Sequence, residues 1–264
     1  MASRTPAVAG TFYPDDAAEL RGLVAGLIAE AGPAAGGAPS PRALVAPHAG
    51  YVFSGSTAAA AFARLAGDLG RWERVAVLGP SHYVTFAGLA LPKADVDAFA
   101  TPLGEVPLDP TAGKELDDLP AVVRANSPHL REHSLEVELP FLQHVLGSFD
   151  LVPLAVGEAT TAEVAAVIER LDDERTLFVI STDLSHYLPY ERAQEVDAAT
   201  ARAVEALAPE AIGERDACGC VPLRGLLAWA RAHDLVAERL ALRNSGDTAG
   251  PRQGVVGYGA WGFA

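Results

Sequence analysis

Three apolar runs in the sequence end in the same way, with a proline or hydroxyl-bearing residues and then a histidine. The run "ALVAPH" ends at His48, "VAVLGPSH" ends at His82, and "LFVISTDLSH" ends with Asp183 and His186. Ligands of an open parallel sheet bind outside the carboxyl ends of its strands. If these runs are strands of one such sheet, the four side chains meet at one edge. Imidazole and carboxylate groups gathered there predict a metal centre or acid–base catalysis.

Two cysteines, Cys218 and Cys220, are separated only by Gly219. A disulfide across one residue would strain an ordinary backbone, so we expect two thiols. A helix is expected to begin near Val221, and a helix N-terminus favours the thiolate, which is both a nucleophile and a metal ligand. The alternative is that both are small buried apolar groups. Side chains on either side of one glycine do not readily share a direction, so one thiol should face the site and the other the core.

The segment "REHSLEVELP" adds His133, with Ser134 and Glu136 beside it at the expected start of a helix. Ser134 is a candidate cap, but Val137 stands where a capping box needs an acid. We expect His133 to join the histidines at the sheet edge. The remaining histidines stand in polar or helical surface settings and are assigned no role: His129, His144 and His233.

Short apolar runs alternate with helical patterns along the whole chain. Strands are expected over 43–47, 74–80, 88–92, 149–156 and 175–182, and in "ERLALRNSG" and "GVVGYGAWGF" near the end. Helices are expected before residue 29 and over 55–67, 134–147, 161–173, 190–207 and 221–233, with a loop over 29–41. This alternation predicts one α/β domain over residues 1–264, with a largely parallel or mixed sheet and helices on both faces.

The composition excludes some classes of function. The 264 residues are 50% hydrophobic, which is enough for a sizeable core. A formal net charge of −14, from 20 Lys+Arg against 34 Asp+Glu, argues against nucleic-acid binding, because an acidic surface repels phosphates. No apolar run approaches the roughly 20 residues that span a bilayer, and "MASRTPAVAG" lacks the apolar part of a signal peptide. We therefore expect a cytoplasmic protein with no membrane partner.

Several motifs together resemble the Memo family, the Memo-type component of the AmmeMemoRadiSam set, which is similar in fold to class III extradiol dioxygenases. They occur in the family's order and span residues 4 to 262: "TPAVAGTFYP", "APHAGYVFSG", "LGPSHY", "EHSLEVELPFLQ", "STDLSHY", "CG" after an acidic stretch, and "GYGAW". The resemblance implies a single Memo-like domain with the extradiol dioxygenase-like fold. It also implies radical-SAM and AMMECR-type proteins as partners.

The resemblance implies a metal site whose ligands match His48, His82 and Cys218. It places Asp183, His186 and His133 in the same pocket; His186 would be the acid–base group, with Asp183 fixing its tautomer if the two meet. In the extradiol relatives the metal is Fe(II), held by two histidines and a carboxylate. The cysteine at the third position is a departure from them. Two imidazoles and a thiolate suit Fe(II), copper or zinc, and three protein ligands leave positions open for a substrate.

Residues that follow His48 are candidates for binding the substrate. Tyr51 and Ser54 are expected at the pocket edge, and a helix N-terminus at 55–57 would attract an anionic group. A plain tight turn also explains Gly50 and Gly55, and it is the favoured explanation of these glycines. The ligand is expected to be a small chelating molecule, an aromatic one or a peptide.

Three functions remain open from the sequence. The first is a metal-dependent, oxygen-using oxidoreductase that acts on a small aromatic or otherwise chelating substrate. The second is a non-enzymatic metal-binding or adaptor protein that works through protein or peptide contacts. The third is a zinc hydrolase that uses metal-bound water with His186 as its base. A cysteine protease is disfavoured, because Cys218 would need a free thiolate rather than a metal bond.

Overall fold

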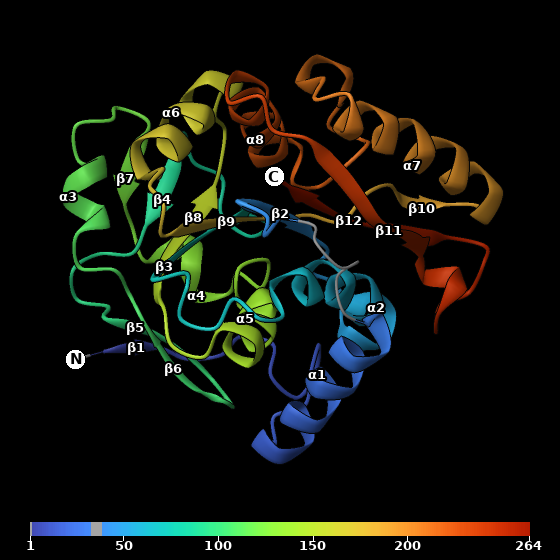
Figure 1. Ribbon diagram of the computed structural model, residues 1–264, viewed down its shortest axis with the longest axis horizontal. Helices are drawn as coiled ribbons and strands as arrows, with labels where there is room; N and C mark the ends of the chain where they lie inside the picture. The colour runs from blue at the N-terminus through green and yellow to red at the C-terminus, as the bar shows by residue number, and fades with distance from the viewer. Residues whose placement is uncertain (1, 33–38) are drawn as a thin grey trace.

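A mixed sheet forms the centre of the molecule, as Figure 1 shows for the computed structural model, which describes residues 2–32 and 39–264. Within this part of the chain the sheet has nine strands. Its parallel centre has the order β2 (Ala43–Ala46), β9 (Thr176–Ser181), β3 (Arg74–Pro80) and β8 (Asp150–Val156). Antiparallel neighbours flank this centre: β12 (Val255–Phe263) beside β2, and β4 (Leu89–Leu91) beside β8.

The remaining strands complete the sheet and form a second, three-stranded one. β11 (Ala237–Asn244) and β10 (His186–Leu188) pair with β12, and β7 (Val122–Arg124) pairs with β4. The small sheet consists of β1 (Ser3–Arg4), β5 (Ala98–Thr101) and β6 (Gly104–Pro107). Apart from β11, these strands were not predicted, because runs of two to four residues do not stand out from loops in an apolar pattern.

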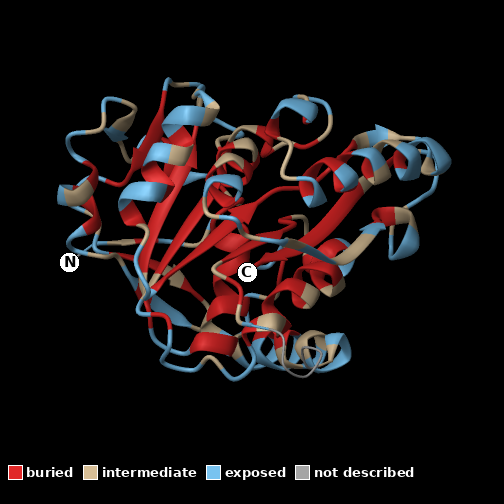
Figure 2. Cartoon of the chain, turned by 45° about the horizontal axis from the view of Figure 1, so that its top comes forward, coloured by how far each residue is buried: buried red, intermediate tan, exposed pale blue. Residues whose placement is uncertain are grey.

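Helices cover both faces of the main sheet. One face carries α1 (Ala17–Ala31), α2 (Tyr51–Phe62) and α5 (Leu139–Leu146); the other carries α6 (Thr161–Leu171), α7 (Tyr190–Glu205) and α8 (Cys220–Ala232). Two short helices, α3 (Ala112–Leu116) and α4 (Ser127–Leu130), lie in connections. Successive residues of a strand point to opposite faces, so in β3 Val75 and Val77 pack into one core while Ala76 and Leu78 pack into the other. Figure 2 shows the sheet buried between the two layers.

Local signals explain several helix ends. The Asp16 side chain caps α1, and Thr160 with Glu163 forms a capping box at α6. The predicted helix over 134–147 is divided into a 3₁₀ turn at Glu136–Glu138 and α5, with Pro140 in the first turn of α5, where a missing N–H costs least. The helix predicted over 55–67 begins earlier, at Tyr51.

The predicted fold class is confirmed: the two cores share one mixed sheet, and the chain forms one α/β domain. The loop predicted over 29–41 falls partly on residues 33–38, which lie outside the described residues, while α1 continues to Ala31. Across the described residues, no helix is long and apolar enough to cross a membrane.

Candidate metal centre

The three histidine-bearing runs of the sequence are adjacent parallel strands. β9 lies between β2 and β3 with both pairings parallel, so the carboxyl ends of all three meet at one edge of the sheet. His48 follows β2 by two residues, His82 follows β3 by two, and Asp183 follows β9 by two. The equal offsets place all three side chains in one layer above the sheet edge.

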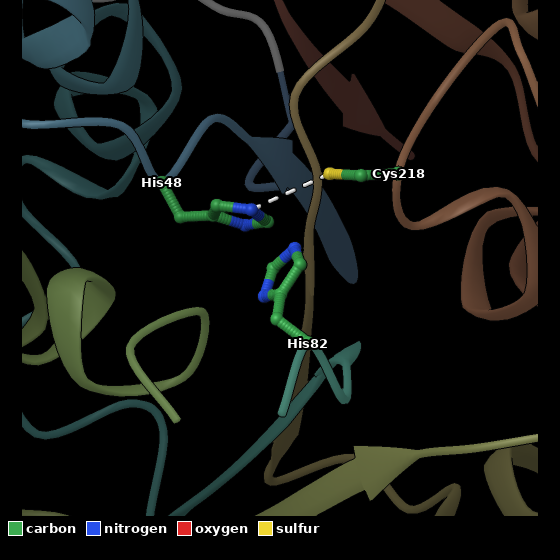
Figure 3. Close-up of side chains that lie close together, drawn as sticks. All are labelled: His48, His82 and Cys218. Carbon is green, nitrogen blue, oxygen red and sulfur yellow. Dashed lines mark hydrogen bonds between the residues drawn. The ribbon is translucent and has the colours of Figure 1, made fainter. Parts of the chain in front are cut away.

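Three potential ligand atoms converge there, and Figure 3 shows their side chains pointing toward one another. The nitrogens of His48 and His82 and the sulfur of Cys218 all lie within 4.8 Å of one another. The Nε2 of His48 is 3.4 Å from the Sγ of Cys218, and the two imidazole centroids are 5.2 Å apart. Donors that share one ion at bonds of about 2.1 and 2.3 Å lie at a similar separation, so the donor set fits a transition metal.

His48 is held in the tautomer that a metal requires. Its Nδ1 lies 2.7 Å from the hydroxyl of Ser181, and that hydroxyl also lies 2.6 Å from the Ser134 carbonyl and 2.7 Å from Glu138. The hydroxyl has one proton to give, so it donates to an oxygen and accepts from Nδ1–H. The lone pair of His48 is then on Nε2, which faces Cys218. Burial lowers the pKa of His48 well below its usual value, which keeps the ring neutral.

His82 is oriented by a buried carboxylate, that of Glu132. Glu132 accepts hydrogen bonds from the His82 backbone N–H at 2.6 Å and from its Nδ1 at 2.8 Å. Burial alone would raise the pKa of Glu132, but the hydrogen bonds from His82 and from the Ser134 backbone outweigh it and lower the pKa to about 2. With its Nδ1 held by the Glu132 carboxylate, His82 directs Nε2 to the centre, as in the carboxylate–histidine pairs of metal proteins.

Cys218 reaches the centre because its loop packs tightly on the end of β9. The Gly219 N–H donates to the Thr182 hydroxyl at 2.8 Å, and a Cβ at position 219 would lie 2.7 Å from the Thr182 Cβ. Only glycine allows this approach. The Asp183 N–H donates to the Cys218 sulfur at 3.3 Å. Cys220 is the first residue of α8 and packs into the core instead.

The thiol of Cys218 is protonated in the absence of a cation. Burial raises its pKa to about 12, with a further contribution from the Asp183 carboxylate. The helix N-terminus does not produce the thiolate that the sequence suggested, because desolvation of the charge is the larger effect. A metal ion must therefore displace this proton when it binds.

The centre lies on the wall of a cavity of about 1090 Å³. His133, Asp183 and His186 line the same cavity. The His133 ring stacks on His82 at 4.7 Å, and burial lowers the pKa of His133. The Asp183 carboxylate accepts from the His48 backbone N–H at 2.9 Å, and burial raises its pKa to about 7.

His186 and Asp183 do not form the hydrogen bond that was expected to fix the His186 tautomer. The Nδ1 of His186 lies 2.8 Å from the Leu184 carbonyl, which can only accept, so Nδ1 carries the proton. The lone pair is on Nε2 of a side chain that lines the cavity, and burial lowers the pKa of the ring. Asp183 is occupied instead with the backbone that carries His48.

Comparison with known proteins identifies the family of this chain. Residues 4–261 match the family described as Memo-like protein. The chain belongs to the Memo-like family. A MEMO1 family protein of Methanopyrus kandleri is 38% identical over 97% of each chain, and one of Aeropyrum pernix is 36% identical over 98% of this chain and 99% of that one. An uncharacterized Escherichia coli K12 protein of known crystal structure aligns with a TM-score of 0.52 at 15% identity, over 83% of this chain and 98% of its own, which shows a shared fold.

Two residues expected at the substrate do not line the cavity of this Memo-like protein. Because α2 begins at Tyr51, the Tyr51 side chain is buried with its hydroxyl donating to the Val137 carbonyl, and Ser54 donates to the Ala49 carbonyl. Their neighbours Val52 and Phe53 line the cavity in their place. The helix was expected to begin only at residue 55, and its earlier start turns the side chains of Tyr51 and Ser54 into the protein, so both are corrected to structural residues.

The surface assignment of His129 is also wrong. His129 is 3% exposed, and its Nε2 lies 3.0 Å from the carbonyl of Ala90 in β4. It sits in a four-residue helix, α4, whose burial no periodicity could reveal. His144 is exposed, and His233 lies half-buried beside Glu169 and Asp172.

Sequence reasoning missed the residues that orient the ligands, above all Glu132, Ser181 and Glu138. Glu132 stands next to His133 in the quoted motif, but nothing in the spacing ties it to a histidine 50 residues earlier. Ser181 is the last residue of β9 and looks like part of an apolar run. The only available signal was indirect: a histidine ligand needs an acceptor for its second nitrogen, and a buried acid is the usual one.

Proposed function

We propose that this Memo-like protein is a metal-dependent oxidoreductase that holds a redox-active transition metal with His48, His82 and Cys218 and acts on a small chelating molecule. The observation that carries the proposal is the convergence of two imidazole nitrogens and a thiol on the wall of a large cavity. Three protein ligands leave coordination positions open, as catalytic rather than structural sites do. Softness of the donors favours iron, copper or zinc over magnesium or calcium, and we choose Fe(II) for a redox role.

The cavity supports a substrate with an apolar or aromatic body. Phe12, Phe53, Tyr83 and Tyr187 line it together with the polar groups near the centre. Apolar walls with a few placed polar groups are typical of small-molecule sites. A bound iron would supply redox chemistry and bind two donor atoms of the substrate. His186, with its free Nε2 in the cavity, is the group placed to accept the proton that a chelating hydroxyl loses.

A second function, binding of a protein or peptide segment without catalysis, is supported by the rim of the cavity. Val52 is 66% exposed, Tyr83 50% and Tyr187 80%. Large apolar side chains gathered at a cavity mouth are a feature of binding surfaces. Tyr187 also has a positive φ of 59°, which is unusual for an aromatic residue and is found most often at functional sites.

Metal content and oxygen consumption separate these functions. The chain is purified anaerobically, loaded with Fe(II), Cu(I) or Zn(II) in turn, and screened for oxygen uptake with catechols and aminophenols. We expect one ion bound per chain with release of a proton from Cys218, and oxygen uptake with the iron form. Tight binding of the ion without oxygen uptake would favour the non-enzymatic binding protein. Hydrolysis by the zinc form alone would favour the zinc hydrolase.

A further inference from the structure

One buried carboxylate, that of Glu136, holds residues 4–13 in place by hydrogen bonds and an ion pair. Glu136 is fully buried in the turn before α5 and accepts hydrogen bonds from the backbone N–H groups of Ala7 at 2.7 Å and Val8 at 3.1 Å. It also accepts from the hydroxyl of Tyr13 and is paired with the guanidinium of Arg4. Residues 4–13 are therefore fixed to a segment more than 120 positions away, which we call the acidic turn (132–138).

Arg4 extends this attachment to the backbone of Glu132, the residue whose carboxylate orients His82. Its guanidinium donates to the backbone carbonyl of Glu132 and, at 2.9 Å, to that of His129, in addition to its pairing with Glu136. Arg4 is 6% exposed. Each of the three guanidinium nitrogens donates to a different residue, and this planar group fixes the direction of each partner, which a flexible ammonium does not. The position of the Glu132 backbone is thus set by a residue of the first strand.

The same segment also reaches the centre through the ring of His133. The Phe12 ring lies edge-on to His133 at 4.9 Å, and His133 stacks on His82. The Phe12 carbonyl accepts from the Tyr51 N–H at 2.8 Å, at the start of the helix that follows His48. Thr11 and Phe12 line the cavity. Residues 4–13 thus support His82 through the acidic turn and close one wall of the site.

We infer that residues 4–13 are the outer support of the metal centre, and that docking of this segment and binding of the metal strengthen each other. Arg4 is the positioning residue of this coupling, because it joins the segment to Glu132. The inference rests on the proposed metal function. If docking raises the affinity for the ion, the ion must stabilise docking by the same factor, because coupling between two binding events is reciprocal.

The first experiment compares Arg4→Lys with a control at the other end of the sheet. Arg74, at the start of β3, also uses its guanidinium on several partners, Asp109, Thr111 and Glu115. Arg74→Lys removes a comparable set of bonds far from the centre. Affinities for Co(II) and Zn(II) are measured by chelator competition, with the Co(II)–thiolate absorption band as a report on geometry. We expect Arg4→Lys to weaken binding about tenfold and to alter the band, and Arg74→Lys to change neither.

The second experiment needs no variant. Hydrogen exchange at the Ala7 and Val8 amides, which donate to Glu136, is measured in the wild-type chain with and without Zn(II). We expect the ion to slow exchange at both amides about tenfold. The Arg175 amide at the opposite edge of the sheet, which donates to Asp173, is the internal reference and should not respond.

The outcomes separate this inference from the proposed function. If the wild-type chain binds no ion, the proposed metal function fails and the coupling fails with it. If the wild-type chain binds the ion through Cys218 but Arg4→Lys binds it within twofold, or if the two amides do not respond to Zn(II), the metal function stands and the coupling alone is overturned. Should Arg4→Lys not fold, the exchange measurement still decides.

Discussion

Of the three groups of potential metal ligands among the described residues, two that share no residue with each other and lie at opposite edges of the sheet differ in what surrounds them. His48, His82 and Cys218 follow the carboxyl ends of parallel strands, whereas Glu169, Asp172 and His233 lie beside the amino end of β9. Both sets bring three donor atoms within 4.8 Å. Proximity of donors is therefore not enough to identify a metal site.

The difference lies in the partners of the donor atoms. At the amino edge, Asp172 already pairs with Arg42, and the Nε2 of His233 lies 3.3 Å from Glu169, whose side chain is 62% exposed. At the carboxyl edge, Ser181 and Glu132 occupy the second nitrogens of the two histidines and leave Nε2 directed at the centre. A surface ion pair is satisfied by its own members, whereas the donor atoms of His48, His82 and Cys218 converge on the wall of a cavity.

The largest expected effect distinguishes the two cysteines of the carboxyl edge. Cys218→Ser replaces a thiolate by a neutral hydroxyl, so we expect the affinity for Fe(II), Cu(I) and Zn(II) to fall more than about 100-fold. Cys220→Ser should leave affinity unchanged and lower the free energy of unfolding by about 1–3 kcal/mol, if the buried hydroxyl finds no partner. Metal titration with folding checked by circular dichroism measures both; equal loss of binding in the two variants would show that Cys218 is not the ligand.

The next largest difference in metal affinity is expected when one glutamate at each edge is replaced by glutamine. Glu132→Gln keeps the shape of the side chain but removes the charge that orients His82, so we expect affinity to fall about 10–100-fold. Glu169→Gln is the matched substitution at the amino edge and should change affinity less than twofold. Chelator competition in both variants decides, and a similar loss in each would indicate that the ion binds at the amino edge or at both.

The sequence predicts the donors better than their surroundings for a physical reason. His48, His82 and Asp183 each follow a continuous apolar strand by two residues, and parallel strands place such positions at one edge. The fold class predicts the order of the strands only in outline. Ser181 and Glu132 become hydrogen-bond partners of the two histidines only because the turn before α5 packs on the ends of β3 and β9. The same packing buries Arg4, and it buries His129, for which the sequence predicted a surface position.

The burial of His129 leads to a prediction about the pH dependence of stability that does not apply to the cluster at the amino edge. Burial lowers the pKa of His129 to about 4, from 6.5 in an unfolded chain. Between pH 4 and 6.5 the imidazole therefore binds a proton in the unfolded state but not in the folded state. The free energy of unfolding is highest above pH 6.5 and falls as the pH drops from 6.5 to 4, by about 3 kcal/mol at most.

His129→Gln keeps a donor for the Ala90 carbonyl but has no group that titrates in this range. Urea unfolding of the metal-free chain at pH 7, 5.5 and 4.5 should show a shallower loss of stability in this variant than in the wild type. The exposed His144 supplies the control, His144→Gln, which should follow the wild type. Parallel curves for all three proteins would mean that His129 is not buried in its neutral form.

The smallest effect is expected at the amino edge. His233→Gln removes the ring that lies 3.3 Å from Glu169 and 3.7 Å from Asp172, and the Glu169 side chain is largely open to solvent. Water and salt screen such a pair, so the free energy of unfolding should fall by less than about 1 kcal/mol, and metal affinity should not change. Urea unfolding at low and high salt, with a parallel zinc titration, tests this. A second zinc ion in the wild type that the variant loses would make the amino edge a true metal site, and the difference in partners would no longer separate the two clusters.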